Sequence, residues 1–535
     1  MGTLYYGDNL TILREHVKDE SVDLVYLDPP FNSNASYNVL FKAPDGHESH
    51  AQMEAFEDTW HWNETAEKAF DEVMQSGNSD AAEMLRAMRS FLHDNDMMAY
   101  LAMMAVRLIE LHRVLKPTGS LYLHCDPVAS HYLKILLDST FGAQFFRNEI
   151  VWKRTFAHGN VSRRYGDVTD AIFYYSKSAD FIWNQQYKQL NESELAEKYP
   201  NKDPDGRRWQ SVTLRNPGVR PNLHFPYKAS NGITYQPHRN GWSCNQERLE
   251  LYDREGRLHF PSRPEGALRL KMYEDKSLGE RLQSLWDDIP PIGAQAQERL
   301  GYPTQKPQLL LERIVATSSN EGDLVLDPFC GCGTTVHAAQ KLNREWIGID
   351  ITHLAISLIQ KRLRDAFGAI PIEVHGTPKD LGGAQALAAQ DKYQFQWWAV
   401  SLVDAVPYGG KKKGADTGID GYIYFKPDGK ITEKAVVSVK GGENVGVPMV
   451  RELISVVDRE TAKMGVLITL AEPTGPMKKE AIAAGFYKTE YGEFPKIQIL
   501  TIEQIFAGQR PHMPWIDPTV FKKAKLEKGK QEKLL

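Results

Sequence analysis

Two consecutive prolines stop an apolar run near the start of the chain. Residues 22–27 read VDLVYL, and Asp28-Pro29-Pro30-Phe31 follows them directly. An apolar run with β-branched and aromatic members, ended by such breakers, predicts a buried strand, and open α/β sheets hold ligands at the carboxyl ends of their strands. The prolines lack N–H donors, so the Asp28 carboxylate and the neighbouring carbonyls can accept hydrogen bonds from a ligand. Without further motifs, the same stretch could equally be a strand end with a tight turn that binds no ligand.

The composition indicates a globular protein of several domains. With 535 residues, 42% of them hydrophobic and 25% charged, the chain is long enough for two to four domains. No apolar run approaches twenty residues and no secretory signal is visible, so we expect a cytoplasmic protein without a membrane span. Because the net charge is −5, any surface that binds nucleic acid must be local.

Strands and helices are predicted to alternate as far as residue 155. We expect strands at residues 3–6, 22–27, 120–124 and 149–152, with helices at residues 10–18, 97–115 and 127–138. A polar, aromatic-rich insertion covers residues 32–93. This alternation predicts a mainly parallel sheet.

A second strand-and-helix unit follows residue 300. The short strand at residues 324–326 leads into DPFCGCGTT at residues 327–335, and a helix follows. Gly331 and Gly333 permit positive φ angles and a close approach of the backbone to a ligand. The next predicted strand ends at Asp350, where a carboxylate can accept hydrogen bonds from both hydroxyls of a ribose. The pattern predicts a site for a nucleotide-type cofactor.

These motifs together resemble the amino-group DNA methyltransferases that use S-adenosylmethionine. DPPF at 28–31 precedes YPTQKP at 302–307 and the glycine-rich motif at 327–335, which is the order of the family's β group. The resemblance implies a Rossmann-like α/β fold with permuted motif order. It also implies that the protein acts on double-stranded DNA in restriction-modification or defence, and it allows a homodimer. The cofactor-binding residues that it implies are Asp327, Phe329, Gly331, Gly333, Thr334 and Asp350, with Asp8 as the next candidate for the ribose.

The catalytic motif has a chemical rationale. Asp28 and the Pro29 carbonyl can accept the two hydrogens of an exocyclic amine, which favours a developing tetrahedral nitrogen in the transition state. Pro30 keeps the turn rigid, and Phe31 can stack on a base flipped out of the duplex. In the family that this chain resembles, DPPF goes mostly with adenine N6 and SPPY mostly with cytosine N4. Asp28 therefore favours adenine N6, and cytosine N4 is the alternative.

The middle region differs in charge from its surroundings. Residues 206–246 contain six Arg or Lys and no Asp or Glu, with aromatic residues interleaved. Such a stretch predicts phosphate contacts and base stacking, and its position matches the target-recognition region of the β group. We expect DNA to be bound by Arg207, Arg208, Arg215 and Arg220.

The C-terminal third resembles the Mrr-type branch of the PD-(D/E)xK restriction endonucleases. In that superfamily an acid precedes a hairpin, whose second strand carries an acid or Gln, one further residue and Lys. Asp420 and Lys440 match, but Ser438 stands where the acid or Gln is expected. Mg²⁺ needs oxygen ligands, so Asp420 is the candidate ligand, and Asp404 or Asp416 could supply the missing charge. The domain is either an active Mg²⁺-dependent nuclease or a non-catalytic DNA-binding module.

The predicted organisation of the chain follows from these motifs. It comprises a catalytic half, a target-recognition region, a cofactor half, a linker, an endonuclease-like domain and a basic tail, at residues 1–155, 156–297, 298–368, 369–391, 392–508 and 509–535.

Overall fold

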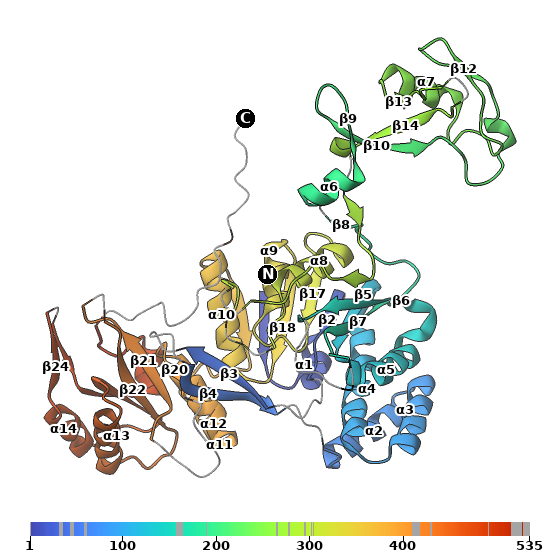
Figure 1. Cartoon of the computed structure of the whole chain (residues 1–535). Coiled ribbons are helices and arrows are strands. Elements are labelled where there is room, and N and C mark those ends of the chain that lie inside the picture. The colour runs from blue at the N-terminus through green and yellow to red at the C-terminus, as the bar shows by residue number, and fades with distance from the viewer. Residues whose placement is uncertain are drawn as a thin grey trace. The chain divides into compact units, whose positions relative to one another are not determined.

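The chain forms two compact units in the computed structural model. The structure describes residues 2–30, 36–42, 48–57, 61–156, 163, 165–188, 190–263, 266–276, 279–293, 296–300, 302, 304–408, 418–428, 431–490, 492–514 and 527. One unit contains Met1–Asn184 and Ser284–Leu535, and the other contains Gln185–Gln283 (Figure 1). None of the described helices is long and apolar enough to cross a membrane.

A nine-stranded sheet forms the centre of the first unit. Its strand order is β16 (Leu285–Trp286), β6 (Phe146–Lys153), β7 (Thr169–Ser176), β5 (Leu115–Cys125), β2 (Val22–Leu27), β17 (Leu324–Asp327), β18 (Glu345–Asp350), β1 (Gly2–Tyr6) and β19 (Ile372–His375). Only β7 runs antiparallel to its neighbours among these described strands. The predicted α/β fold with a mainly parallel sheet is confirmed.

Helices cover both faces of this sheet (Figure 1). Because side chains alternate along each strand, a strand contributes residues to the core on either face. On β2, Val25 and Leu27 belong to one core, whereas Leu24 and Tyr26 belong to the other. The first core includes residues of α1 (Asn9–His16), α2 (Glu64–Gln75), α3 (Ser79–Leu92), α4 (Asp96–Val114) and α5 (Pro127–Leu137). The second includes residues of α8 (Gln308–Ser318), α9 (Thr334–Lys341) and α10 (His353–Phe367).

The insertion predicted at residues 32–93 is more regular than its polar composition indicates. Its first part contains the antiparallel pair β3 (Ser36–Lys42) and β4 (Glu48–Glu57). Its second part contains α2 and α3, which bury Phe70 and Leu85 in the first core. These helices are amphipathic, so their polar faces dominate the composition although their apolar faces contribute to the core.

The two halves of the motif pattern meet at the centre of the sheet. Strand β17 pairs in parallel with β2, with Val325 opposite Leu24 and Leu326 opposite Val25. The carboxyl ends of both strands therefore lie at the same edge. This adjacency joins segments that are about three hundred residues apart in the chain, and it is where open α/β sheets bind ligands.

The prediction of a linker at residues 369–391 is wrong. This segment begins with β19, which pairs with β1 at the sheet edge. It continues into α11 (Leu381–Gln390), whose Ala384 and Leu387 are buried in the core of the C-terminal domain. Alanine has a high helix propensity and its small side chain packs closely, so an Ala-rich stretch can form a core helix.

The C-terminal domain has its own five-stranded sheet. The strand order is β20 (Val406–Pro407), β21 (Gly421–Phe425), β22 (Glu433–Lys440), β23 (Met464–Thr469) and β26 (Ile497–Thr501). Residues of α11, α12 (Lys392–Ser401) and α15 (Ile502–Phe506) pack on one face, and residues of α13 (Val447–Arg459) and α14 (Gly475–Ala483) on the other. The hairpin of β24 (Phe486–Thr489) and β25 (Gly492–Pro495) completes the domain.

The unit Gln185–Gln283 is shorter than the predicted region 156–297, because β7 and β16 at its borders belong to the large sheet. It contains a four-stranded sheet in the order β13 (Leu258–His259), β14 (Arg269–Tyr273), β10 (Arg208–Thr213) and β9 (Asn201–Lys202). The other elements of the unit are β8 (Tyr187–Lys188), α6 (Glu192–Lys198), β11 (Tyr227–Lys228), β12 (Thr234–Tyr235), α7 (Gln246–Arg254) and β15 (Glu280–Arg281).

Candidate active site

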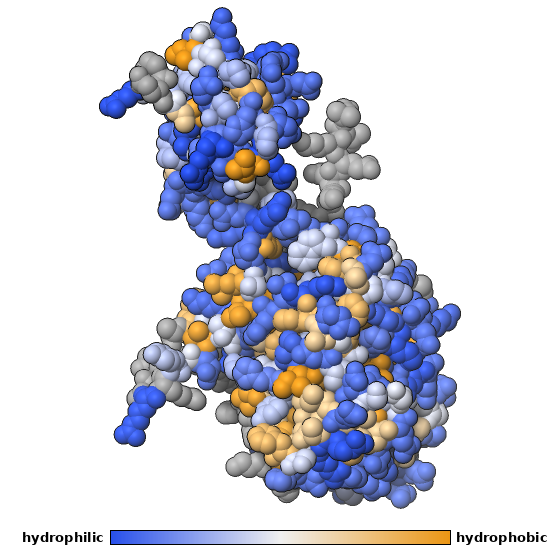
Figure 2. Space-filling view, turned by 90° about the vertical axis from the view of Figure 1, so that its right-hand side faces the viewer, coloured by the Kyte–Doolittle hydropathy of each residue, from blue (hydrophilic) through white to orange (hydrophobic). Residues whose placement is uncertain are grey.

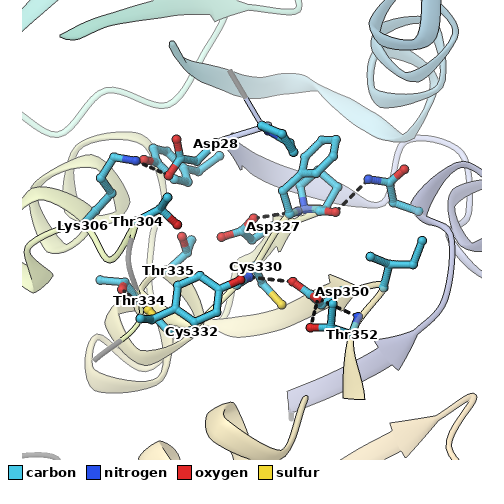
Figure 3. A pocket seen from close by; sticks show the side chains of 18 of the residues that line it. Asp28, Thr304, Lys306, Asp327, Cys330, Cys332, Thr334, Thr335, Asp350 and Thr352 are labelled. Atoms are coloured by element: carbon cyan, nitrogen blue, oxygen red, sulfur yellow. Dashed lines mark hydrogen bonds and ion pairs between the residues drawn. The ribbon is translucent and has the colours of Figure 1, made fainter. Parts of the chain in front are cut away.

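Four carboxylates meet in one cavity at the carboxyl edge of the large sheet. Asp8, Asp28, Asp327 and Asp350 follow or end the strands β1, β2, β17 and β18, and all four line a cavity of about 360 Å³. Figure 3 shows Asp28, Asp327 and Asp350 around it. Pro30, Phe329, Gly331 and Thr334 line the same cavity. The structure thus brings together most of the site residues that we expected from the two motifs. Phe31 lies outside the described residues.

Lys306 forms an ion pair with Asp28 inside this cavity. The Lys306 ammonium donates to Asp28 Oδ2, and the two side chains are only 11% and 16% exposed (Figure 3). Lys306 belongs to the YPTQKP segment, to which the sequence analysis assigned no chemistry. The pair balances the charge of Asp28, so an incoming amine must share that carboxylate with an ammonium group.

Asp350 holds the glycine-rich turn in place. Its Oδ2 accepts from the Gly331 N–H at 2.9 Å, and its Oδ1 accepts from the Thr352 N–H at 2.9 Å and from the Thr352 hydroxyl at 2.8 Å. Gly331 and Gly333 have φ angles of 49° and 75°. A Cβ on Gly333 would lie 2.7 Å from Cγ1 of Ile359, so the turn requires glycine at that position for space as well as for conformation.

Burial changes the acidity of the two carboxylates beside this turn. Burial, with a contribution from the charges of Asp28 and Asp350, raises the pKa of Asp327 to about 7, although hydrogen bonds from Thr335 and Phe329 act in the opposite direction. Burial also raises the pKa of Asp350 to about 6, against hydrogen bonds from Thr352 and Gly331. A cluster of acids that repel one another favours a cationic ligand, because the ligand's charge stabilises their ionised forms.

A hydrogen-bonded chain connects the two halves of the site. Arg107, buried on α4, donates from Nε to Asn9 Oδ1 at 2.6 Å and from Nη2 to Asp8 Oδ2 at 2.8 Å. Asn9 Nδ2 donates in turn to the Pro328 carbonyl at 2.9 Å. Asp8 therefore has a cation partner and also caps α1, where its side chain accepts from the Thr11 N–H. The sequence contained no signal for Arg107, because a single Arg in a long helix has the pattern of a surface residue.

Tyr26, which lines the cavity, hydrogen-bonds to a buried polar pair on the neighbouring strands. Its hydroxyl lies 2.9 Å from His124 Nδ1, and His124 Nε2 lies 3.0 Å from Asp170 Oδ2. All three side chains are buried. No pattern in the sequence predicts this network, because its members come from three different strands of the sheet.

The expected basic, aromatic surface is only partly present. Trp209, Tyr227, Tyr235 and Trp242 are each at most 6% exposed, so the interpretation of these aromatic residues as a stacking surface is wrong. Figure 2 shows a largely hydrophilic face of this unit, with isolated hydrophobic residues. A small domain needs such large side chains for its own core.

The four predicted DNA-binding arginines fall into two classes. Arg207 pairs with Asp205 at 2.8 Å, and Arg208 pairs with Glu192 at 2.9 Å. Asp205 directly precedes the acid-free stretch, whereas Glu192 belongs to α6 and packs against it. Arg215 and Arg220 are exposed, and their side chains form no ion pair with any residue that the structure describes. The second pair therefore has uncompensated charge for phosphate contacts.

In the C-terminal domain, Asp420 lies beside the end of β22, the strand that carries Lys440. Asp420 Oδ2 accepts from the Val439 N–H at 2.7 Å, next to Lys440 at the end of β22. Ser438 is buried on the same strand. Asp404 follows α12, whereas Asp416 lies outside the described residues. The described part of the chain holds no group of three His, Cys, Asp or Glu residues that could bind a metal ion.

Comparisons with known proteins agree with this geometry. Residues 22–361 match the N6/N4 family model described as DNA methylase, and residues 387–491 match a model described as restriction endonuclease. The type II methyltransferase M.EcaI of Enterobacter cloacae is 28% identical over 372 residues, which are 69% of this chain and 70% of that protein. The StyLTI Mod subunit of Salmonella typhimurium, a type III restriction-modification enzyme, is 26% identical over 355 residues, 63% of this chain and 50% of that subunit.

A shorter match is the DNA adenine methyltransferase YhdJ of Escherichia coli, which is 44% identical over 80 residues, 15% of this chain and 27% of that protein. The DNA methylase model spans more than half of the chain and includes the strand ends at Asp28, Asp327 and Asp350 that line the cavity. The chain therefore belongs to the N6/N4 DNA methylase family.

Proposed function

We propose that this chain transfers a methyl group from S-adenosylmethionine to N6 of adenine in double-stranded DNA, as part of restriction-modification. The observation that carries the proposal is the shared cavity. Asp28, at the end of β2, lines the same cavity as the glycine-rich turn and Asp350. The turn follows β17 and Asp350 ends β18, and β17 lies between β2 and β18 in the sheet. An amine acceptor and a cofactor cradle thus lie side by side.

The residues of the cavity fit S-adenosylmethionine. A Cβ on Gly331 would lie 3.2 Å from the ring of Tyr302, so the turn packs against this ring with little room for a side chain, and both residues line the cavity. The acids Asp327 and Asp350 suit a ligand with a positive charge. Asp350 and Asp8 are the acceptors available for ribose hydroxyls, and Asp350 would serve both the ribose and the turn.

The reaction requires the chain to activate a poor nucleophile. When bound, the cofactor supplies an electrophilic methyl group on a sulfonium ion. Asp28 and the Pro29 carbonyl accept the two amine hydrogens, which draws the lone pair of the nitrogen out of the ring. Lys306 holds the Asp28 carboxylate in place and limits its freedom to rotate, since it donates to Oδ2. The low exposure of both side chains excludes water from this contact.

Asp28 and the match to YhdJ support adenine as the target, and cytosine N4 is the alternative. The test is sequencing with modified-base detection of DNA from a methylation-free host that expresses the chain or its Asp28→Ala variant. We expect N6-methyladenine at one sequence motif, and none with Asp28→Ala. N4-methylcytosine at a motif would reassign the target, and unmodified DNA with a folded wild-type protein would contradict the proposal.

A second activity is favoured by the C-terminal domain. The contact of Asp420 with the end of β22, beside Lys440, and the match to the restriction endonuclease model support a Mg²⁺-dependent nuclease. We propose that this domain cleaves DNA that the first activity has not methylated. Incubation of purified protein with unmethylated and premethylated DNA and Mg²⁺ tests it, because only the unmethylated DNA should be cut.

A further inference from the structure

Helix α12 makes contacts on two sides. It lies within residues 387–491, which match the restriction endonuclease model, and its Phe395 and Trp398 are buried in the core of the C-terminal domain. Gln394 and Trp397 instead contact residues of the segment that matches the DNA methylase model. These two positions are three residues apart, so they lie on one side of the helix. One helix therefore belongs to the endonuclease-like domain and also contacts the methyltransferase.

Trp397 packs where the glycine-rich turn is held. It contacts the cluster of Tyr302 and Cys332, which are 6% and 4% exposed, and Leu354 and Leu358 of α10 pack against the same cluster. Tyr302 and Cys332 both line the cavity, and Cys332 belongs to the glycine-rich turn itself. No residue of α12 lines the cavity that the structure describes. Trp397 therefore supports two residues of the cofactor cradle without reaching the cofactor space.

Gln394 meets the start of α10, the helix that follows Asp350. Its Oε1 accepts from the His353 N–H at 3.4 Å. His353 is the first residue of α10, and the first N–H groups of a helix have no acceptor within that helix. Thr352, the preceding residue, donates to Asp350 Oδ1 through both its N–H and its hydroxyl. A side chain of the endonuclease-like domain thus satisfies a donor three residues from the acceptor proposed for the ribose.

The end of β1 meets the same junction. The Tyr6 ring stacks on the His353 ring, with 3.6 Å between the ring centroids. Burial raises the pKa of Tyr6 to about 12, with contributions from the charges of Asp391, which caps α12, and of Asp350. The start of α12 is therefore close enough to β1 and to Asp350 for its charge to act on the same hydroxyl.

We infer that Trp397 and Gln394 are positioning residues of the cofactor site, through which the endonuclease-like domain holds the glycine-rich turn and the start of α10 in the geometry that binds S-adenosylmethionine. The inference rests on the proposed methyl transfer. Because neither residue touches the reacting atoms, its loss acts on cofactor affinity and spares the chemical step. Cofactor binding and the packing of α12 therefore stabilise each other.

Calorimetric titration of the full chain with S-adenosylmethionine tests the inference. We expect Trp397→Ala to weaken binding by about two- to thirtyfold, the range for residues that act on a site without contact with its ligand. Trp397→Phe keeps an aromatic ring and should restore most of the affinity, and Gln394→Ala should weaken binding in the same direction. The controls are Tyr393→Ala, which removes a ring of the same helix that is 47% exposed, and Gln396→Ala. Both controls should bind as the wild type does.

Kinetics separate positioning from a general loss of structure. Trp397→Ala should raise KM for the cofactor and leave kcat and KM for DNA close to the wild-type values, whereas partial unfolding would impair all three. If Trp397→Ala does not fold, Gln394→Ala decides by the same measurements.

Wild-type affinity for the cofactor in both Trp397→Ala and Gln394→Ala would overturn the inference and leave the methyl-transfer proposal intact. The inference would also fail if Tyr393→Ala and Gln396→Ala weakened binding as much, since that would be a general effect of changes in α12. A folded wild-type chain that binds no S-adenosylmethionine would contradict the methyl-transfer proposal itself, and the inference with it.

Discussion

Asp28 and Lys306 pair inside the cavity although 278 residues separate them in the chain. At the scale of single residues, the site contains two kinds of carboxyl group: those whose charge is balanced by a cation, and those whose pKa is raised by burial. Asp8 pairs with Arg107, and Asp327 and Asp350 hold raised pKa values. Each of these charges has a separate consequence for binding or for methyl transfer.

Asp28→Ala should abolish methyl transfer and leave cofactor binding nearly unchanged, because Asp28 acts on the amine. Removal of one transition-state hydrogen bond usually lowers turnover by about 100-fold or more. Tritium transfer from labelled cofactor to DNA measures turnover, and calorimetry measures cofactor affinity. The control Glu72→Ala removes a surface carboxylate that pairs with Arg14 at 2.9 Å and should change neither quantity. Transfer by Asp28→Ala above a tenth of the wild-type rate would contradict this role.

Cofactor affinity should rise with pH between about 5 and 8. The raised pKa values, about 7 for Asp327 and about 6 for Asp350, mean that both carboxyls lose their charge as the pH falls through this range. The attraction for a sulfonium ion weakens accordingly, by up to about tenfold per pH unit for each proton that must be released. Calorimetry across the range measures it. Asp327→Asn should flatten the profile, and a wild-type affinity independent of pH would refute the argument.

At the scale of elements, two segments depend on how they pack. The glycine-rich turn between β17 and α9 is held by Asp350 and fits closely against Ile359 of α10. In the unit Gln185–Gln283, the basic stretch divides into arginines that are paired and arginines that are not. Neither property follows from the composition of the segment.

Gly333→Ala should destabilise the protein more than Gly77→Ala. Both glycines have similar φ angles, 75° and 78°, but a Cβ at Gly77 would meet nothing within 4 Å. We expect Gly77→Ala to cost about 1 kcal/mol from the left-handed backbone alone. The clash with Ile359 should add roughly 1–3 kcal/mol at Gly333. Thermal unfolding of the two variants measures the difference, and equal melting temperatures would show that the turn has room for a side chain.

Arg215 and Arg220 should contribute more to DNA affinity than Arg207 and Arg208. Replacement of both unpaired arginines by Gln should reduce the slope of log affinity against log salt by about 1.8, at roughly 0.9 per lost phosphate contact. The Arg207→Gln/Arg208→Gln variant is the matched control, and we expect a smaller change because these side chains already pair with acids. Binding assays at several salt concentrations decide it, and a larger effect in the control would reverse the assignment.

At the scale of the whole molecule, the two proposed activities should be separable by mutation. Asp28 follows a strand of the nine-stranded sheet and Asp420 precedes a strand of the five-stranded sheet, and the two sheets have different cores. Asp28→Ala should therefore spare cleavage of unmethylated DNA, and Asp420→Ala should abolish cleavage and spare methylation. Both activities are measured on the same purified protein. If Asp420→Ala lost methylation while it still bound the cofactor, the two domains would not act independently.

Local patterns predicted much of this molecule correctly. The strands that end at Asp28, Asp327 and Asp350, the glycine-rich turn and the mainly parallel sheet were all expected from runs of apolar residues, breakers and motif order. They follow from the sequence because strand ends, turns and glycine conformations depend on residues that are neighbours in the chain. Composition was less reliable. It hid the core helices α2, α3 and α11, because a helix contributes to a core through one face only.

Only the tertiary structure decided which charges meet. The pairing of Lys306 with Asp28, of Arg107 with Asp8 and of Glu452 with Lys440 joins residues from different elements. Burial likewise placed the aromatic residues of the middle unit in a core instead of on a surface. Electrostatic interaction and burial depend on distance in space, and a linear pattern contains no such distances until the chain has folded.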